Sequence, residues 1–131
     1  MKLLLDTHIF LWSLLEPEKL GKNTTEILEN SGNEIWLSPI TLWETIVLAG
    51  KGRISLNKEP GEWLRMVLKQ IPLREAPLNF NVAIESRYIT VAHHDPADRF
   101  LAATAKIYNL TLVTADQNLL ACPDIQLLEN R

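Results

Sequence analysis

Short apolar runs alternate with amphipathic stretches along the whole chain. Short apolar runs of strand length fall at residues 2–5, 35–37, 110–114 and 125–128, and residues 71–76 are expected to form a further short strand or extended piece. Such continuous runs are typical of strands in a parallel sheet that is buried on both faces. Between them the pattern predicts helices at residues 7–15, 23–30, 39–50, 62–69, 79–87 and 96–108. Strands that alternate with helices predict an α/β fold in three layers, with a central parallel sheet and helices on both faces.

Capping residues mark where several of these helices begin. Thr7 is expected to cap the first helix. Ser38 is followed by proline and Asp95 is followed by Pro96, and a capping residue before proline is a common helix start. With Asp95 as the cap, Asp98 takes the third helical position.

Length and composition narrow the class of protein. The 131 residues fit one domain, which we assign to residues 1–131. A formal net charge of −3 argues against a broad electrostatic grip on nucleic acid. The single cysteine, Cys122, cannot form an internal disulfide, which suits a reducing compartment. The apolar run at 9–15 is far shorter than the roughly 18 residues of a membrane helix. We therefore expect a cytoplasmic protein with no membrane span.

Two predicted strands lead into an aspartate. Asp6 follows LLL directly, and Asp116 follows TLVTA. In open parallel sheets, ligands bind just beyond the carboxyl ends of the strands, so both carboxylates are expected at that edge. Aspartate is also a favoured helix cap, and from the sequence each residue is equally well explained in that way.

Two more acids lie on predicted helix faces among apolar residues. Glu44 shares a face with Ile40 and Val47, and Asp98 shares one with Leu101 and Ala102. An unpaired carboxylate is costly to bury among apolar groups. Glu44 either sits at the border of its apolar stripe with its head in water or points into a polar site. For Asp98 the helix dipole offers a structural explanation, but we favour Asp98 as the functional acid and Asp95 as the cap.

Four converging carboxylates would repel one another unless a cation neutralised them. Oxygen ligands favour Mg²⁺ or Mn²⁺ over zinc, and no cysteine or paired-histidine spacing offers a zinc site. His93 and His94 are adjacent and are interpreted as local hydrogen-bonding residues. His8 is interpreted as a histidine at the edge of the core.

The chain as a whole resembles the PIN-domain family, and in particular the VapC-type toxins of type II toxin–antitoxin pairs. The resemblance rests on four segments in order: LLLDTHIFLW, SPITLWE, HHDPADRFLAATA and LTLVTADQNL. It implies a PIN-like three-layer fold and a Mg²⁺- or Mn²⁺-dependent endoribonuclease that hydrolyses RNA with a metal-activated water. It also implies a cognate antitoxin as partner and a homodimer.

The resemblance assigns roles to individual residues. The acidic metal-binding and catalytic set is Asp6, Glu44, Asp98 and Asp116. Thr114 corresponds to the hydroxyl residue two positions before the last acid, and Thr7 and Asn118 are supporting groups around the acids. By their charge, the candidate contacts to RNA phosphates are Arg99, Lys51 and Arg53. Lys51 and Arg53 are equally well explained as part of an ordinary solvated loop, and an ion pair of Arg99 with an acid such as Asp95 is the alternative for that residue.

Other functions remain open at this stage. A metal-dependent DNA nuclease would use the same acids, and a phosphatase is a further alternative, although His8 stands where haloacid-dehalogenase-like phosphatases carry a second aspartate. A non-catalytic module that uses a PIN-like fold for pairing is the third alternative. The tryptophans at 12, 36, 43 and 63 would suit an interface or the core.

Overall fold

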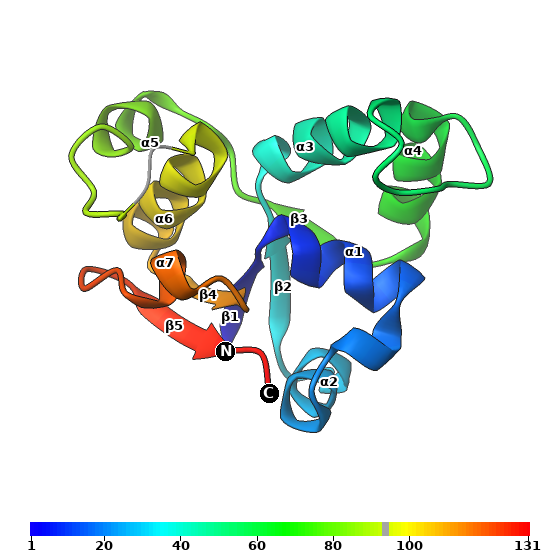
Figure 1. Ribbon diagram of the computed structural model, residues 1–131. Coiled ribbons are helices and arrows are strands. Elements are labelled where there is room, and N and C mark those ends of the chain that lie inside the picture. Colours follow the sequence, from blue (N-terminus) through cyan, green and yellow to red (C-terminus); the bar gives the residue numbers. More distant parts are fainter. Residues whose placement is uncertain (93–94) are drawn as a thin grey trace.

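Five parallel strands form the centre of the fold, in the spatial order β3-β2-β1-β4-β5 (Figure 1). The computed structural model describes residues 1–92 and 95–131, so His93 and His94 lie outside the described residues. The central strand β1 pairs on one side with β2 and on the other with β4, and Leu4 lies opposite both Trp36 and Leu112. The strands are β1 (Lys2–Leu5), β2 (Glu34–Leu37), β3 (Leu73–Glu75), β4 (Thr111–Thr114) and β5 (Gln126–Glu129).

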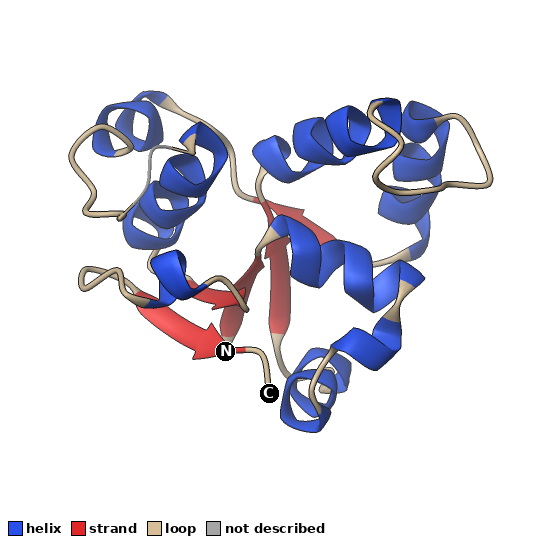
Figure 2. Ribbon diagram, in the orientation of Figure 1, coloured by secondary structure: helices blue, strands red, loops and turns tan. Residues whose placement is uncertain are grey.

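Helices lie on both sides of the sheet. Figure 2 shows α1 to α4 on one side and α5 with α6 on the other, which confirms the expected three-layer α/β architecture. The helices are α1 (Thr7–Leu15), α2 (Lys22–Glu29), α3 (Pro39–Gly50), α4 (Pro60–Gln70), α5 (Phe80–Glu85), α6 (Pro96–Tyr108) and α7 (Gln117–Leu120), with a short 3₁₀ helix η1 (Pro17–Lys19).

The two faces of β1 enter separate hydrophobic clusters. Leu3 and Leu5 pack with residues of α1 and α4, whereas Leu4 packs with residues of α6. All three leucines are at most 3% exposed. Successive side chains of a strand point to opposite faces, so a strand covered by helices on both sides has no polar positions. This is the physical reason for the continuous apolar run in the sequence.

Several element boundaries differ from the sequence-based prediction. The prediction that Thr7 caps the first helix is wrong, because Asp6 caps α1 and Thr7 is the first residue of that helix. Helix α4 begins at Pro60 rather than 62, since Glu59 accepts hydrogen bonds from the amides of Gly61 and Glu62. The strand expected at 71–76 is shortened to Leu73–Glu75. The short elements η1 and α7 carry too little periodicity to be recognised from the sequence.

The end of the described chain packs against the start of α2. The amide of Gly21 donates to the Asn130 side chain at 2.9 Å, and the amide of Thr24 donates to the Arg131 carbonyl at 3.1 Å. A Cβ atom on Gly21 would lie 1.9 Å from the Arg131 carbonyl carbon, so the close approach requires glycine. Within the described ranges, no helix is long and apolar enough to cross a membrane.

Candidate active site

The order of the strands creates one edge where several elements meet. From β1 the chain builds outward through β2 and β3, and β4 and β5 are then added on the other side of β1. Ligands in open α/β sheets bind at such a reversal, beyond the carboxyl ends of the strands. Asp6 follows β1 and Asp116 follows the neighbouring β4 by two residues. The two aspartates therefore lie at adjacent strand ends.

Asp6 is buried and held by three hydrogen bonds. Its Oδ1 accepts from the amides of His8 at 2.7 Å and Ile9 at 3.3 Å, which caps α1. Its Oδ2 accepts from the Thr114 hydroxyl at 2.5 Å. Burial raises the pKa of Asp6 above its ordinary value, and these hydrogen bonds act in the opposite direction. The carboxylate is thus fixed in place by backbone and side-chain donors.

Thr114 connects the two aspartates at the strand ends. Its hydroxyl donates to Asp6 and accepts the amide of Asp116 at 3.0 Å. Asp116 in turn caps α7, where its Oδ1 accepts from the amides of Asn118 at 2.8 Å and Leu119 at 3.1 Å. One hydroxyl therefore sets the position of both residues.

Glu44 reaches the same region from α3. The Thr7 hydroxyl donates to Glu44 Oε1 at 2.5 Å and lies 3.3 Å from the hydroxyl of the buried Thr41. Burial raises the pKa of Glu44, and the charges of Asp95 and Asp6 raise it further. Of the two readings that the sequence left open for Glu44, the structure favours a carboxylate in a polar site over one with its head in water.

Asp98 shows most clearly that the acids converge. Burial raises the pKa of Asp98 to about 7, and the negative charges of Asp95, Asp116, Asp6 and Glu44 add to the effect in that order. Helix α6, which carries Asp98, contacts α3, which carries Glu44. The charges of the other three predicted acids therefore all act on Asp98 at this edge of the sheet.

Asp95 and Asp98 occupy the positions in α6 that the sequence predicted, namely the cap and the third helical residue. Asp95 caps α6, and its Oδ1 accepts from the amide of Ala97 at 2.9 Å. Leu101 and Ala102, on the same face as Asp98, are at most 1% exposed. Asp95 as a cap is confirmed, and its charge also contributes to the acidic cluster.

The donor chemistry of the cluster fits a hard divalent cation. All four side chains offer carboxylate oxygens. Burial raises the pKa of Asp6, Glu44 and Asp98, so their charged forms are less stable here than in water. Among the described residues, no three acidic, histidine or cysteine side chains are grouped closely enough to hold one ion between them. Mg²⁺ commonly keeps several waters and binds through one or two carboxylates together with substrate phosphates. An open site of this kind fits that mode of binding better than a closed protein cage.

The structure places the other predicted residues at varying distances from this cluster. The Asn118 side chain is exposed, and the residue meets Asp116 through its backbone amide. Lys51 and Arg53 are exposed beyond the end of α3, with Lys51 about 10 Å along the helix axis from Glu44 at 1.5 Å per residue. His8 is exposed rather than at the edge of the core, and its ring lies 5.8 Å from that of Trp12.

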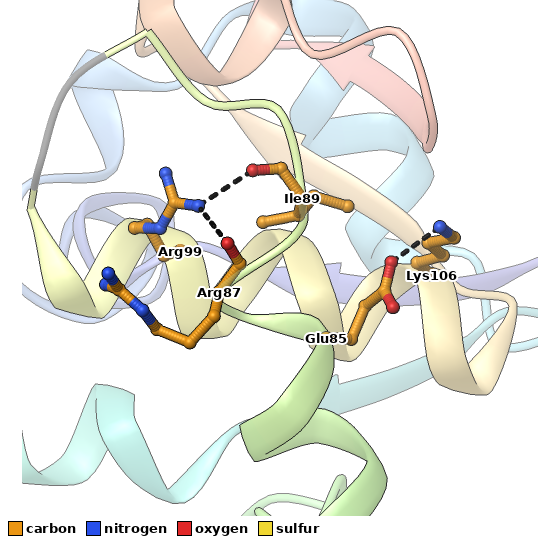
Figure 3. A network of polar contacts seen from close by, with 5 residues as sticks. All are labelled: Glu85, Arg87, Ile89, Arg99 and Lys106. Carbon is orange, nitrogen blue, oxygen red and sulfur yellow. Dashed lines mark hydrogen bonds and ion pairs between the residues drawn. The ribbon is translucent and has the colours of Figure 1, made fainter.

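Arg99 has a contact that the sequence did not reveal. Its Nε donates to the Ser86 carbonyl at 2.8 Å, and its Nη2 donates to the carbonyls of Arg87 at 3.3 Å and Ile89 at 2.9 Å. Figure 3 shows the guanidinium group of Arg99, on α6, turned toward the loop that follows α5. Further along the same helix pair, Lys106 donates to Glu85 at 2.5 Å (Figure 3). Arg99 thus fastens the first turn of α6, next to Asp98, to the end of α5.

Comparison with known proteins identifies relatives for almost the whole chain. The family model described as "PIN domain" matches residues 3–123. Ribonuclease VapC22 from Mycobacterium tuberculosis is 30% identical over 117 residues, which cover 88% of each chain. Among solved structures, the fold is similar to VapBC2 from Rickettsia felis, bound to a DNA fragment from its promoter, with a TM-score of 0.73, 19% identity and full coverage of both chains. It is also similar to DNA-bound VapBC from Salmonella typhimurium, with a TM-score of 0.69, 22% identity and 98% coverage of both.

Proposed function

Because the chain belongs to the PIN-domain family, we propose that it is a VapC-type endoribonuclease, the toxin of a type II toxin–antitoxin pair. We take residues 1–131 as one such domain. VapC22, which is 30% identical to this chain, is a ribonuclease, and this is the reason to propose RNA rather than DNA as the substrate. Because its proposed substrate is RNA, we also propose that the protein acts in the cytoplasm.

One observation carries the catalytic part of the proposal. Asp6, Glu44, Asp98 and Asp116 come from α3, α6 and the ends of β1 and β4, and the Thr114 hydroxyl joins the two strand-end acids. Burial raises the pKa of Asp98 to about 7, and the charges of the other three acids raise it further. A fold does not need such a concentration of like charge for stability, and strongly perturbed groups of this kind are typical of functional sites. A bound cation turns the same repulsion into attraction.

The acids would share the work as follows. Within the set Asp6, Glu44, Asp98 and Asp116, one or two carboxylates would hold each Mg²⁺ or Mn²⁺ ion together with waters and the substrate phosphate. When bound, the ion would polarise a phosphate oxygen and lower the pKa of a water for in-line attack. Asp6 and Asp116 keep their positions through backbone amides and the Thr114 hydroxyl. Thr7 orients Glu44. A cation beside Asp98 would favour the charged form of its carboxylate.

The acidic chain also has to hold a polyanion. Lys51 and Arg53 are exposed and carry the charge for phosphate contacts at the far end of α3. Arg99 remains a candidate contact as well, although its Nε and Nη2 donate to backbone carbonyls. A homodimer would bring two sets of these cations to one RNA.

Digestion of one sequence as RNA and as single-stranded DNA tests the activity. We expect cleavage of the RNA in Mg²⁺ or Mn²⁺ and none in EDTA. Glu44→Gln should reduce cleavage at least about 100-fold, since even loss of an outer partner of a metal ligand costs 10–100-fold. Asp124→Asn is the matched control, because this exposed acid precedes β5 at the opposite edge of the sheet. Cleavage of the DNA alone would refute the ribonuclease assignment.

Expression in bacteria tests the role as a toxin. The wild-type protein should arrest growth, and Asp6→Asn or Asp98→Asn should abolish the arrest while the variants remain folded. Unchanged arrest by both variants would show that these acids are not the active site. Co-expression of a small protein encoded beside the gene should restore growth if that protein is the antitoxin.

Exposed apolar side chains support the proposal of protein partners. Phe80, Ile84 and Tyr88 are 90%, 60% and 77% exposed, and they follow one another at four-residue spacing in and just after α5. Phe80 and Ile84 lie four residues apart in α5 and therefore on the same side of the helix, and Tyr88 follows in the turn after it. Both solved structures described above are VapBC proteins, and a third similar structure, VapBC-5 from Mycobacterium tuberculosis, is described as a member of the VapBC family of toxin–antitoxin systems. Sedimentation should show a dimer of this chain at micromolar concentration, and Phe80→Glu should weaken it.

A further inference from the structure

An apolar cavity opens directly beside the acidic cluster. It has a volume of about 550 Å³ and lies between the first turns of α3 and α6. Glu44 and Asp95 contribute to its wall at the side of the cluster. The remaining wall is apolar and is formed mainly by Pro39, Ile40, Trp43, Leu78, Pro96 and Phe100.

Trp43 is the largest side chain in this wall and is unusually open to solvent. It precedes Glu44 in α3 and is 59% exposed, whereas Trp63 in the core is 5% exposed. Single exposed apolar residues are common on protein surfaces and need no explanation. Trp43 differs because it lines a concave pocket together with Phe100 and stands next to a predicted catalytic acid.

We propose that this cavity receives an unpaired nucleobase of the RNA substrate, stacked on Trp43, next to the phosphate bound at the acids. The inference rests on the proposed function and adds a base-binding subsite to it. Proteins that bind single-stranded RNA commonly stack splayed bases on aromatic side chains.

The chemistry of the wall favours a base over a phosphate. None of the nine described residues that line the cavity is Lys or Arg, so a phosphate would find no positive partner there. A base is flat, largely uncharged and able to stack. The volume lies within the 300–1,000 Å³ typical of small-molecule pockets, which leaves room for a base and part of its sugar.

The connection to the acidic cluster limits the base that could enter to one close to the bound phosphate. Trp43 and Glu44 both line the cavity, and one nucleotide joins a base to its phosphate through a single sugar. A strand whose phosphate lies at the acids therefore carries a neighbouring base to the mouth of the cavity. Trp43 would then contribute a modest base preference, set by the strength of stacking, at one position relative to the cut.

Cleavage of a random-sequence RNA pool, followed by sequencing of the new 5′ ends, tests this subsite. For wild type we expect a base preference at one position beside the cut. Trp43→Ala should lose that preference and raise KM about tenfold or more, the effect of losing one base stack, with a smaller change in kcat. Trp43→Phe keeps an aromatic face and should retain most of the preference.

Ile46→Ala is the matched control. Ile46 is 46% exposed, lies one turn further along α3, and is not part of the cavity wall. Its replacement should leave both the preference and KM unchanged. All variants should first be compared with wild type by thermal unfolding, so that a misfolded protein is recognised.

Two results would overturn the subsite. The first is Trp43→Ala cleaving the pool with wild-type preference and wild-type KM. The second is a loss of activity in Trp43→Ala that accompanies dissociation of a dimer and is restored at protein concentrations where the dimer forms, which would identify the cavity as a protein interface. If the wild-type protein cuts no RNA at all, the proposed function fails, and that outcome is distinct from the other two.

Discussion

The four acids reach the candidate site in two different ways. Asp6 and Asp116 stand at strand ends and cap α1 and α7, so backbone amides hold them. Glu44 and Asp98 project from the sides of α3 and α6, where a threonine hydroxyl holds Glu44 and neighbouring carboxylates crowd Asp98. The first pair is positioned by local backbone geometry, and the second pair by the packing of helices.

For Asp6 and Asp116, capping a helix does not exclude the metal-binding role that we propose. From the sequence alone, a cap and a metal ligand were alternative explanations for Asp6 and Asp116. In the structure each caps a helix with Oδ1 only. The second oxygen is left for other partners, which is the Thr114 hydroxyl in the case of Asp6. Capping fixes the direction of the carboxylate, and a metal ligand benefits from a fixed direction.

The largest expected effect separates Asp98 from its neighbour Asp95. Asp98→Asn should lower RNA cleavage at least about 100-fold, because it removes a carboxylate from the centre of the cluster. Asp95→Asn should lower cleavage less than about tenfold, since asparagine caps a helix as well as aspartate does. Initial rates at saturating Mg²⁺ measure both. A larger loss in Asp95→Asn than in Asp98→Asn would reverse our assignment of the pair.

The second prediction concerns stability and pH. Asp98 has a pKa of about 7 in the folded protein against an ordinary 3.8, so the folded state binds the proton more tightly than the unfolded chain. Stability is therefore lost as pH rises from about 4 through 7. Without divalent metal, Asp98→Asn should melt several degrees above wild type at pH 8, and the difference should vanish near pH 4. Thermal melts across this range in EDTA measure it, and a difference independent of pH would contradict it.

The third prediction tests how α6 is held in position. Arg99→Ala should destabilise the fold by about 2 kcal/mol, because charged hydrogen bonds to buried or partly buried carbonyls are worth roughly 1.5–3 kcal/mol. Arg99→Lys should not restore the stability, since an ammonium group cannot reproduce the planar fork. Lys106→Gln is the control, because it breaks an exposed α5–α6 ion pair of little energetic weight. Urea unfolding measures the free energy of unfolding of the three variants. Equal losses of stability in Arg99→Ala and Lys106→Gln would show that the Arg99 hydrogen bonds do not hold α6 in position.

The smallest expected effect concerns the strand-end pair. Asp116→Asn should change stability by less than about 0.5 kcal/mol, because asparagine can accept the same two amides at the start of α7. The same variant should lose RNA cleavage, since its amide replaces a carboxylate oxygen. Melting temperature and cleavage rate, measured on one preparation, separate the two roles. A marked loss of stability would mean that the charge of Asp116 supports the fold as well.

Much of the fold was predictable from local pattern. The buried strands, the cap and proline at the start of α6, and the inward face of that helix all follow from residues within one or two turns of each other. The cap of α1 was misassigned by one residue, because neighbouring Asp6 and Thr7 both suit that role. The partners of Arg99 were not predictable, since they are backbone carbonyls 10 to 13 residues earlier in the chain.

By itself the sequence determined the main strands and helices, although not the short η1 and α7. It also placed Asp6 and Asp116 beyond strand ends and Glu44 and Asp98 on helix faces, because periodicity and capping are local properties. Only the tertiary structure decided that β1 lies between β2 and β4, which brings Thr114 to Asp6 across 108 residues of chain. It also decided that α3 and α6 meet, which crowds the acids and opens the cavity beside Trp43. Strand order and helix contacts depend on the packing of distant segments, and no local pattern encodes that packing.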